Sequence, residues 1–328
     1  NHANRIREYI QDPGIGYARV EKILNAAHAI KFQISRNIGV KRQTEEEKRK
    51  ALLERYRKPK SEYPLLEPKA KEEEPPPDFK KIPVEPEEDL LMFIMEYSKL
   101  TDWEKDIINI VREETLYFLP QIETKIMNEG WASFWHYNIL NKLELDQGLH
   151  IEFLKRHNQV LRPLMGQINP YYVGFKIFQD IKKRYADDPK KIFEVREIER
   201  DQSFIRRYLT RELCEEMNLF EYMKLGSSYI ITEVSDEEGW QKVRDTIANS
   251  VGLSGIPVIN VVEWVRKDNT LVLEHRYDGR ELELAYAYET LKHIVDLWEG
   301  KVMLATKIDN KNKLIICDEQ KKVALTDG

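Results

Sequence analysis

The spacing of apolar residues changes once along this chain, near residue 190, and this change limits the fold more than any other feature. Before it, as in Trp103 to Ile122, apolar side chains recur every three or four residues, which is typical of amphipathic helices. These helices are rich in aromatic side chains, which are large enough to build a core. The core of this region is expected to include Trp131, Trp135, Tyr171 and Tyr172.

After residue 190, short strand-like runs alternate with two helical stretches, 236–250 and 281–298. The expected strands are residues 229–234, 257–265, 271–276, 302–307 and 314–317. The whole pattern predicts the fold class α + (α+β): a helical region with an aromatic-rich core, followed by a separate α+β domain with a mainly antiparallel sheet.

Residues 41–88 differ in composition from the rest of the chain. Lys, Arg and Glu dominate the first twenty of them, and eight of the 14 prolines lie between Pro59 and Pro86. Such a segment buries too little apolar surface to offset the entropy that ordering costs, so it is predicted to be a charged, proline-rich linker. The sequence therefore predicts four parts: a helical piece at 1–40, the linker at 41–88, a helical domain at 89–186 and the α+β domain at 190–328.

Composition excludes several classes of protein. Cys214 and Cys317 are the only cysteines, so a disulfide scaffold and a cysteine-rich zinc module are both excluded. The net charge is −5, which gives no reason to expect a basic surface for nucleic acid. The most apolar run, 256–265, is far shorter than the roughly 20 residues of a membrane span. We expect a cytoplasmic protein with no nucleic-acid partner and no membrane span, whose protein partners are unknown.

The densest group of unusual residues lies at 113–136. Glu129 and His136 are seven residues apart, which places both side chains on one face of a helix. The small residues Gly130 and Ala132 beside them would let another helix approach closely. A carboxylate and an imidazole are both metal ligands, so this face is a candidate metal site. The same spacing also fits a surface glutamate beside aromatic packing residues, and both interpretations remain open.

Other ionisable residues are weaker candidates for a metal-binding or catalytic role. One of the adjacent Glu113 and Glu114 can point inward, although a solvated acidic turn explains both. His150 and His157 share a helix face and fit a packing or surface role better than metal binding. His2 has no acidic partner nearby in the sequence.

Several aromatic-rich segments resemble the SpoVR family, stage V sporulation protein R. They are Thr124 to Tyr137, TKIMNEGWASFWHY; His157-Asn158-Gln159-Val160; and Asn169-Pro170-Tyr171-Tyr172-Val173-Gly174. The resemblance implies a role in forming the spore cortex, the modified peptidoglycan of bacterial spores. Family members carry a longer amino-terminal region with a His-x-x-x-His-x-Asp-Phe-Phe segment. That segment is absent from these residues, so the chain is expected to be amino-terminally truncated.

The resemblance also changes the interpretation of Glu129. In many helical zinc metallopeptidases, two histidines of one helix are joined by a glutamate from a later helix, often in an Asn-Glu-Gly-x-Ala context. Asn128-Glu129-Gly130-Trp131-Ala132 is similar to that context, which usually continues as x-Tyr, but this chain has Phe134 in the place of the tyrosine. This similarity implies a Zn²⁺ or another divalent metal on Glu129 in the full-length protein, and none in this fragment. Because the family segment lacks the glutamate of HExxH, Glu114 or His136 would have to act as the catalytic base.

Two hypotheses for function follow. The first is a metal-dependent hydrolase that acts on a peptide or peptidoglycan-precursor bond, with water activated by the metal. The second is a non-enzymatic regulatory or scaffold protein of cortex assembly, in which the linker and the α+β domain are docking surfaces. Whether the protein is an enzyme stays open at this point.

Overall fold

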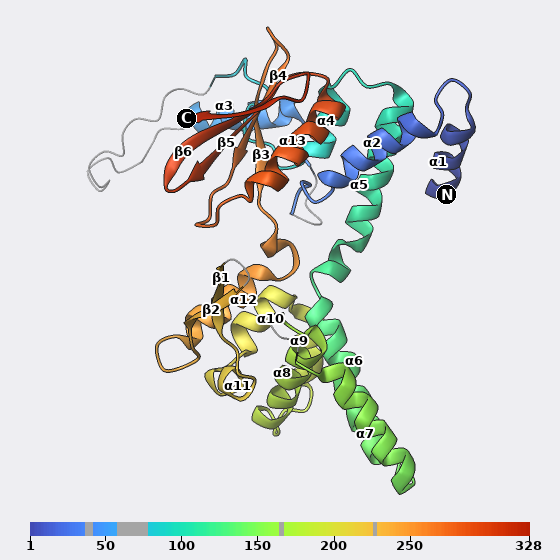
Figure 1. Cartoon of the computed structure of the whole chain (residues 1–328), viewed down its shortest axis with the longest axis vertical. Coiled ribbons are helices and arrows are strands. Elements are labelled where there is room, and N and C mark those ends of the chain that lie inside the picture. Colours follow the sequence, from blue (N-terminus) through green and yellow to red (C-terminus); the bar gives the residue numbers. More distant parts are fainter. Residues whose placement is uncertain (37–41, 58–77, 164–166, 226–227) are drawn as a thin grey trace. The chain divides into compact units, whose positions relative to one another are not determined.

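The computed structural model describes residues 1–36, 42–57, 78–163, 167–225 and 228–328. Their contacts divide the chain into two compact units, and the predicted fold class is confirmed (Figure 1). The first unit contains residues 1–116 and 257–328, and the second contains residues 117–256. None of the described helices is both long and apolar enough to cross a membrane.

The first unit is built on a five-stranded sheet in the order β3-β4-β5-β6-β7. All neighbouring strands are antiparallel except β4 and β5, which are parallel because helix α13 connects them. The strands are β3 (Ile259–Val265), β4 (Thr270–His275), β5 (Val302–Ile308), β6 (Lys311–Cys317) and β7 (Val323–Asp327).

Helix α13 (Leu284–Trp298) covers one face of this sheet (Figure 1). Its second half is buried, including Leu291 and Val295, and Trp298 is 1% exposed with its indole N–H donating to the carbonyl of Asn269 at 2.9 Å. Helix α2 (Tyr17–Ala29) packs on α13, and Lys22 pairs with Asp296 at 3.0 Å. The amino-terminal helices therefore belong to the unit that holds the carboxy-terminal sheet. The remaining helices of this unit are α1 (His2–Gln11), α3 (Glu45–Arg57), α4 (Leu90–Tyr97) and most of α5 (Asp102–Ile122).

The predicted linker, 41–88, is described only in part. Residues 58–77, which hold six of its eight prolines, lie outside the described residues. The parts on either side make contacts: Lys48 of α3 donates to the buried Glu87 at 2.6 Å. The backbone of Glu87 exchanges two hydrogen bonds with Val261 of β3. The ends of this segment are therefore fastened to the first unit.

The second unit is mostly helical. It contains α6 (Lys125–Lys142), α7 (Gln147–Leu161), α8 (Pro170–Arg184), α9 (Lys191–Ile198), α10 (Asp201–Tyr208), α11 (Arg211–Glu216) and α12 (Trp240–Ser250), with the hairpin β1 (Glu221–Leu225) and β2 (Ser228–Glu233). Residues 190–256, grouped with the α+β domain from the sequence, lie in this unit, and Ile192 and Val195 of α9 join its core. The independent folding of the four predicted parts stays a prediction.

The core of the second unit centres on buried rings such as Phe134, Phe178 and Phe204. The four aromatic residues expected there are only partly buried and pack against the edge of the core instead. These four side chains are Trp131, Trp135, Tyr171 and Tyr172.

Candidate functional site

The candidate site lies where α6 and α8 cross. A Cβ atom on Gly130 would lie 2.4 Å from the Cα of Gly174, and a Cβ on Gly174 would lie 2.3 Å from the carbonyl oxygen of Ile126. No side chain fits at such distances, so the two backbones are in direct contact. The expectation that the small residues of α6 admit a second helix is confirmed at Gly130.

The crossing brings Glu129 next to the first turn of α8. Asn169 caps that turn, accepting hydrogen bonds from the backbone N–H of Tyr171 at 3.0 Å and of Tyr172 at 3.5 Å. The Tyr171 hydroxyl donates to the half-buried Glu129 carboxylate, and this hydrogen bond, together with partial burial, raises the pKa of Tyr171. Among the described residues, Glu129 forms no ion pair with a lysine, an arginine or a histidine.

Two side chains hold the start of α6 in place. The Asp201 carboxylate, at the start of α10, accepts hydrogen bonds from the backbone N–H of Ile126 and Met127, each at 2.9 Å. Asp201 is 1% exposed, and this burial raises its pKa to about 6 although the N–H donors favour the charged form. Arg196 donates to the Asn128 side chain at 2.7 Å, so the residue before Glu129 is also fixed.

His136 lies two turns beyond Glu129 on the same face of α6, and its ring is exposed. It packs against Phe153 and His157 of α7, with ring centroids 5.4 and 5.8 Å away. His157 is buried, and its Nε2 has no hydrogen-bond partner among the described residues. Burial, and then the nearby His136, lower the pKa of His157, so it is a neutral packing residue at pH 7. The predicted packing role of His157 is confirmed.

Glu114 lies in the first unit, whereas Glu129 and His136 lie in the second. Its carboxylate is 2.6 Å from Nδ1 of His2, and the neighbouring Glu113 is 3.0 Å from Nε2 of the same ring. Asn109 also donates to Glu113 at 2.9 Å. His2, which has no acidic partner nearby in the sequence, is therefore paired with two glutamates that are distant in the chain. Its partners are more than 110 positions away in the chain, and no local signal in the sequence marks such a pairing.

Glu129 fits a divalent metal as one ligand, because it is a half-buried carboxylate without a cationic partner among the described residues. The part of the chain that the structure describes contains no group of three or more His, Cys, Asp or Glu side chains arranged around one ion. Catalytic zinc usually takes three protein ligands. Glu129 by itself would therefore not complete such a site among the described residues.

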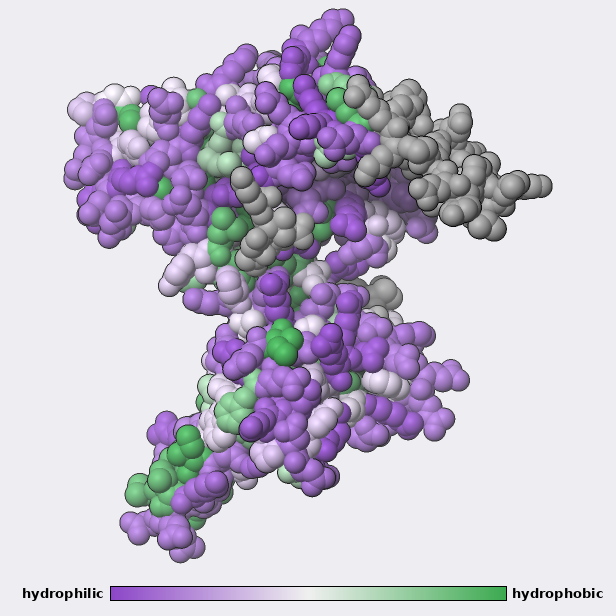
Figure 2. All heavy atoms as spheres, turned by 180° about the vertical axis from the view of Figure 1, so that it is seen from behind, coloured by the Kyte–Doolittle hydropathy of each residue, from purple (hydrophilic) through white to green (hydrophobic). Residues whose placement is uncertain are grey.

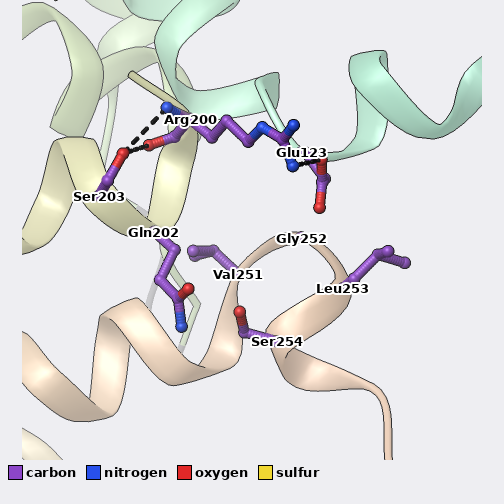
Figure 3. A pocket seen from close by; sticks show the side chains of 8 residues that line it. All are labelled: Glu123, Arg200, Gln202, Ser203, Val251, Gly252, Leu253 and Ser254. Carbon is purple, nitrogen blue, oxygen red and sulfur yellow. Dashed lines mark hydrogen bonds and ion pairs between the residues drawn. The ribbon is translucent and has the colours of Figure 1, made fainter. Parts of the chain in front are cut away.

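A separate hollow of about 130 Å³ lies elsewhere in the second unit (Figure 3). Its charged groups are already paired, since Arg200 donates to Glu123 at 2.7 Å. The Ser203 hydroxyl bonds the Arg200 backbone in the cap of α10 and is not activated by a base. Arg200, Glu123 and the Ser203 hydroxyl are thus engaged with one another or with the cap of α10. Its lining residues are Glu123, Arg200, Gln202, Ser203, Val251, Gly252, Leu253 and Ser254.

Comparison with known proteins gives the family. Residues 1–256 match the family described as "SpoVR like protein", and residues 257–309 match the "SpoVR-like C-terminal domain". The limit between the two matches coincides with the limit of the second compact unit. A curated protein of Escherichia coli (strain K12), "Uncharacterized protein YcgB", is 31% identical over 343 residues, which covers 91% of this chain.

The chain spans 66% of the length of that relative, slightly less than two thirds. No solved structure matches the chain. The two family matches together cover most of the chain, including α6, α8 and the crossing between them. The chain belongs to the SpoVR family.

Proposed function

We propose that this protein acts in forming the spore cortex, as a metal-dependent hydrolase of a peptide or peptidoglycan-precursor bond. One observation carries the proposal. Glu129 stands at the Gly130–Gly174 crossing, half-buried and hydrogen-bonded to Tyr171, without a cationic partner among the described residues. A carboxylate in such surroundings is suited to a cation. The other ligands would come from outside the described residues.

The described residues would fix the orientation of that carboxylate. The backbone contact at Gly130 and Gly174 sets the spacing of α6 and α8, and the Tyr171 hydroxyl donates to the Glu129 carboxylate. Asp201 and Arg196 fasten the preceding turn of α6. Such support from neighbouring groups is what metal ligands require to keep their geometry. A bound divalent metal would supply an activated water at neutral pH.

His136 is a better candidate for the catalytic base than Glu114. Its imidazole is exposed on the same helix face as Glu129, and it has no ion-pair partner among the described residues. The Glu114 carboxylate is engaged by His2 at 2.6 Å. We expect His136→Gln to lower kcat by about 100-fold or more, because a general base contributes roughly that factor. Glu114→Gln should lower kcat much less. A larger loss of kcat for Glu114→Gln than for His136→Gln would assign the role of catalytic base to Glu114.

The experiment that tests the metal site is metal analysis of the protein at its natural full length. Mass spectrometry should detect about one Zn²⁺ or other divalent ion per chain. Glu129→Gln should lose the ion while its thermal unfolding stays close to that of the parent without metal. The matched control is Glu144→Gln, an exposed carboxylate just beyond the end of α6, which should keep the ion. An ion retained by Glu129→Gln would exclude Glu129 as a ligand.

The second candidate function is a non-enzymatic scaffold of cortex assembly. It is favoured by an exposed apolar surface at the end of the α6–α7 hairpin, which a metal hydrolase does not require. The same measurement separates the two functions. Absence of a stoichiometric metal, together with normal cortex in cells that carry Glu129→Gln, would overturn the proposed hydrolase function. The scaffold function would then remain.

A further inference from the structure

The last strand, β7, is a free edge of the five-stranded sheet. It pairs with β6 on one side and forms no strand pair with a described residue on the other. Residues 324–327 of this strand are exposed, with Leu325 at 41%. The opposite edge, β3, is partly covered, because Val261 exchanges two backbone hydrogen bonds with Glu87. Among the described residues, β7 is therefore the edge at which the sheet can be extended.

Two hydrogen bonds show which backbone groups of β7 point outward. The N–H of Gly328 donates to the carbonyl of Asn312, and the N–H of Asp318 donates to the carbonyl of Lys322, both at 3.1 Å. Because inward and outward groups alternate along an antiparallel strand, the even-numbered residues of β7 bond to β6. Its odd-numbered residues therefore direct their backbone N–H and C=O groups away from the sheet. These residues are Val323, Leu325 and Asp327.

The edge of β7 is not protected against pairing with another chain. Natural proteins usually block a free edge with proline, lysine, a bulge or a cover. Strand β7, with the sequence VALTD, contains neither proline nor lysine, and its continuous register with β6 contains no bulge. Figure 2 shows one face of the first unit, where the described residues are mostly hydrophilic. A partner would therefore gain more from backbone hydrogen bonds along β7 than from apolar contacts on that face.

We propose that β7 is the interface of a homodimer, in which the β7 strands of two copies pair antiparallel and join their sheets into one continuous sheet. The two-fold axis passes through Leu325, the middle of the five strand residues. Leu325 then lies opposite Leu325 of the partner subunit, and Val323 lies opposite Asp327 of the partner subunit. Each pair of opposed residues exchanges two hydrogen bonds, so every outward N–H and C=O group obtains a partner.

The symmetry of β7 selects a second copy as the occupant. Opposed residues in an antiparallel pair lie on the same face of the sheet, so the two-fold axis must pass through a residue and not between two residues. Only a strand with an odd number of residues then overlaps its own copy over its full length. Strand β7 has five residues, and its middle residue and both of its ends point outward, which gives the largest number of hydrogen bonds for this length.

The side chains of β7 are compatible with this pairing. The exposed Leu325 side chains would meet at the axis and bury apolar surface. On the other face, the small Ala324 would lie opposite Thr326 of the partner subunit. Like charges directly opposite each other would destabilise the pair. Within β7 none are opposed, because Asp327 faces a valine and is paired with Lys313 of its own chain.

The first test is sedimentation equilibrium of the chain across a concentration series. The parent chain should dimerise, and Leu325→Lys should raise the dimer dissociation constant about tenfold or more, because it sets two like charges opposite each other at the axis. The matched control is Tyr17→Lys, at a residue that is 61% exposed on α2 of the same unit, and it should dimerise like the parent. Circular dichroism should show that both variants stay folded.

A proline variant tests the backbone hydrogen bonds themselves. Leu325→Pro removes the outward N–H and places a ring at the edge, so it should also raise the dissociation constant about tenfold or more. The fold should tolerate this proline, because the N–H of Leu325 does not bond to β6 and proline is accepted on edge strands. The thermal unfolding of this variant, measured beside that of the parent, checks that the sheet is intact.

The second test fixes the register. With the axis at Leu325, Ala324 and Thr326 of the partner subunit form a pair without hydrogen bonds, whose Cα atoms are about 4.5 Å apart. This distance suits a disulfide. A mixture of Ala324→Cys and Thr326→Cys chains should therefore form a mixed disulfide under mild oxidation. Ala324→Cys alone should form little, because its own copies are diagonal neighbours about 7–8 Å apart. The native cysteines are buried and would not interfere.

Three outcomes would overturn the proposal. The first is a parent chain that stays monomeric at every concentration, which would leave the edge of β7 to an extended peptide of another protein. The second is a dimer that both Leu325→Lys and Leu325→Pro leave intact, because the interface then lies elsewhere. The third is a dimer that forms no mixed disulfide, because its strands are then not centred on Leu325. None of these measurements involves Glu129, so they are independent of the proposed hydrolase function.

Discussion

Gly130 and Gly174 touch backbone to backbone, and this contact sets the distance between α6 and α8. A single added methyl group would lie 2.4 Å from the opposite backbone. Atoms of the core cannot move aside at such a point without shifting a helix. The position of Glu129 relative to Tyr171 therefore depends on two residues that carry no side chain.

Gly174→Ala should lower the free energy of unfolding by about 1–3 kcal/mol, the usual range for overpacking a core. Denaturation in urea measures this change. The matched control is Gly148→Ala in α7, where a Cβ would meet no atom within 4 Å. That variant should be unchanged or slightly more stable, since alanine favours helix over glycine. Equal effects at both glycines would contradict a tight crossing.

Asp201 should make the protein less stable as the pH rises from about 4 to 6. Its pKa is about 6 in the folded protein, because burial raises it, and near 3.9 in an unfolded chain. Between these values the folded state binds more protons than the unfolded state, so the free energy of unfolding falls with rising pH. Two pKa units correspond to about 3 kcal/mol. Asp201→Asn, compared with the parent by urea denaturation at pH 4 and pH 7, should remove this decrease.

Titration of His157 should have the opposite effect, so that the protein becomes less stable as the pH falls. Burial and the nearby His136 lower its pKa in the folded protein, so the unfolded state binds the proton more readily. The contribution of neutral His157 to the free energy of unfolding is fully present above the pKa of histidine in the unfolded chain, near 6.5. It is lost as the pH falls below that value. His157→Phe keeps a ring among Phe153 and Phe175 and removes the unpaired Nε2. Its melting temperature should therefore fall less between pH 7 and pH 5 than that of the parent. A parallel fall in both proteins would contradict this account.

The sequence predicted those features that depend on local spacing. The helical stretch at 281–298, which contains α13, and the small Gly130 of α6 are both local features of one helix, so the spacing of residues finds them. Features formed across the chain were not predictable in this way. Asp201 caps α6 from 75 residues away, and His2 meets Glu113 from 111 residues away. Helix α2 packs on α13 near the other end of the chain. Such contacts have no local pattern, because folding alone brings their partners together.

The last prediction concerns the proline-rich segment. Limited proteolysis of the native chain should cut first within residues 55–86, because their prolines and charges offer little apolar surface to pack. The fragments should stay together in gel filtration, because Lys48 and Glu87 pair across the segment and the Glu87 backbone is bonded to Val261 of β3. Glu87→Ala should loosen this attachment, since it leaves Lys48 without a carboxylate at 2.6 Å, and the amino-terminal fragment should then separate more readily. Strong protection of residues 55–86 from the protease, with the first cuts inside α8, would contradict the prediction that this segment is a linker.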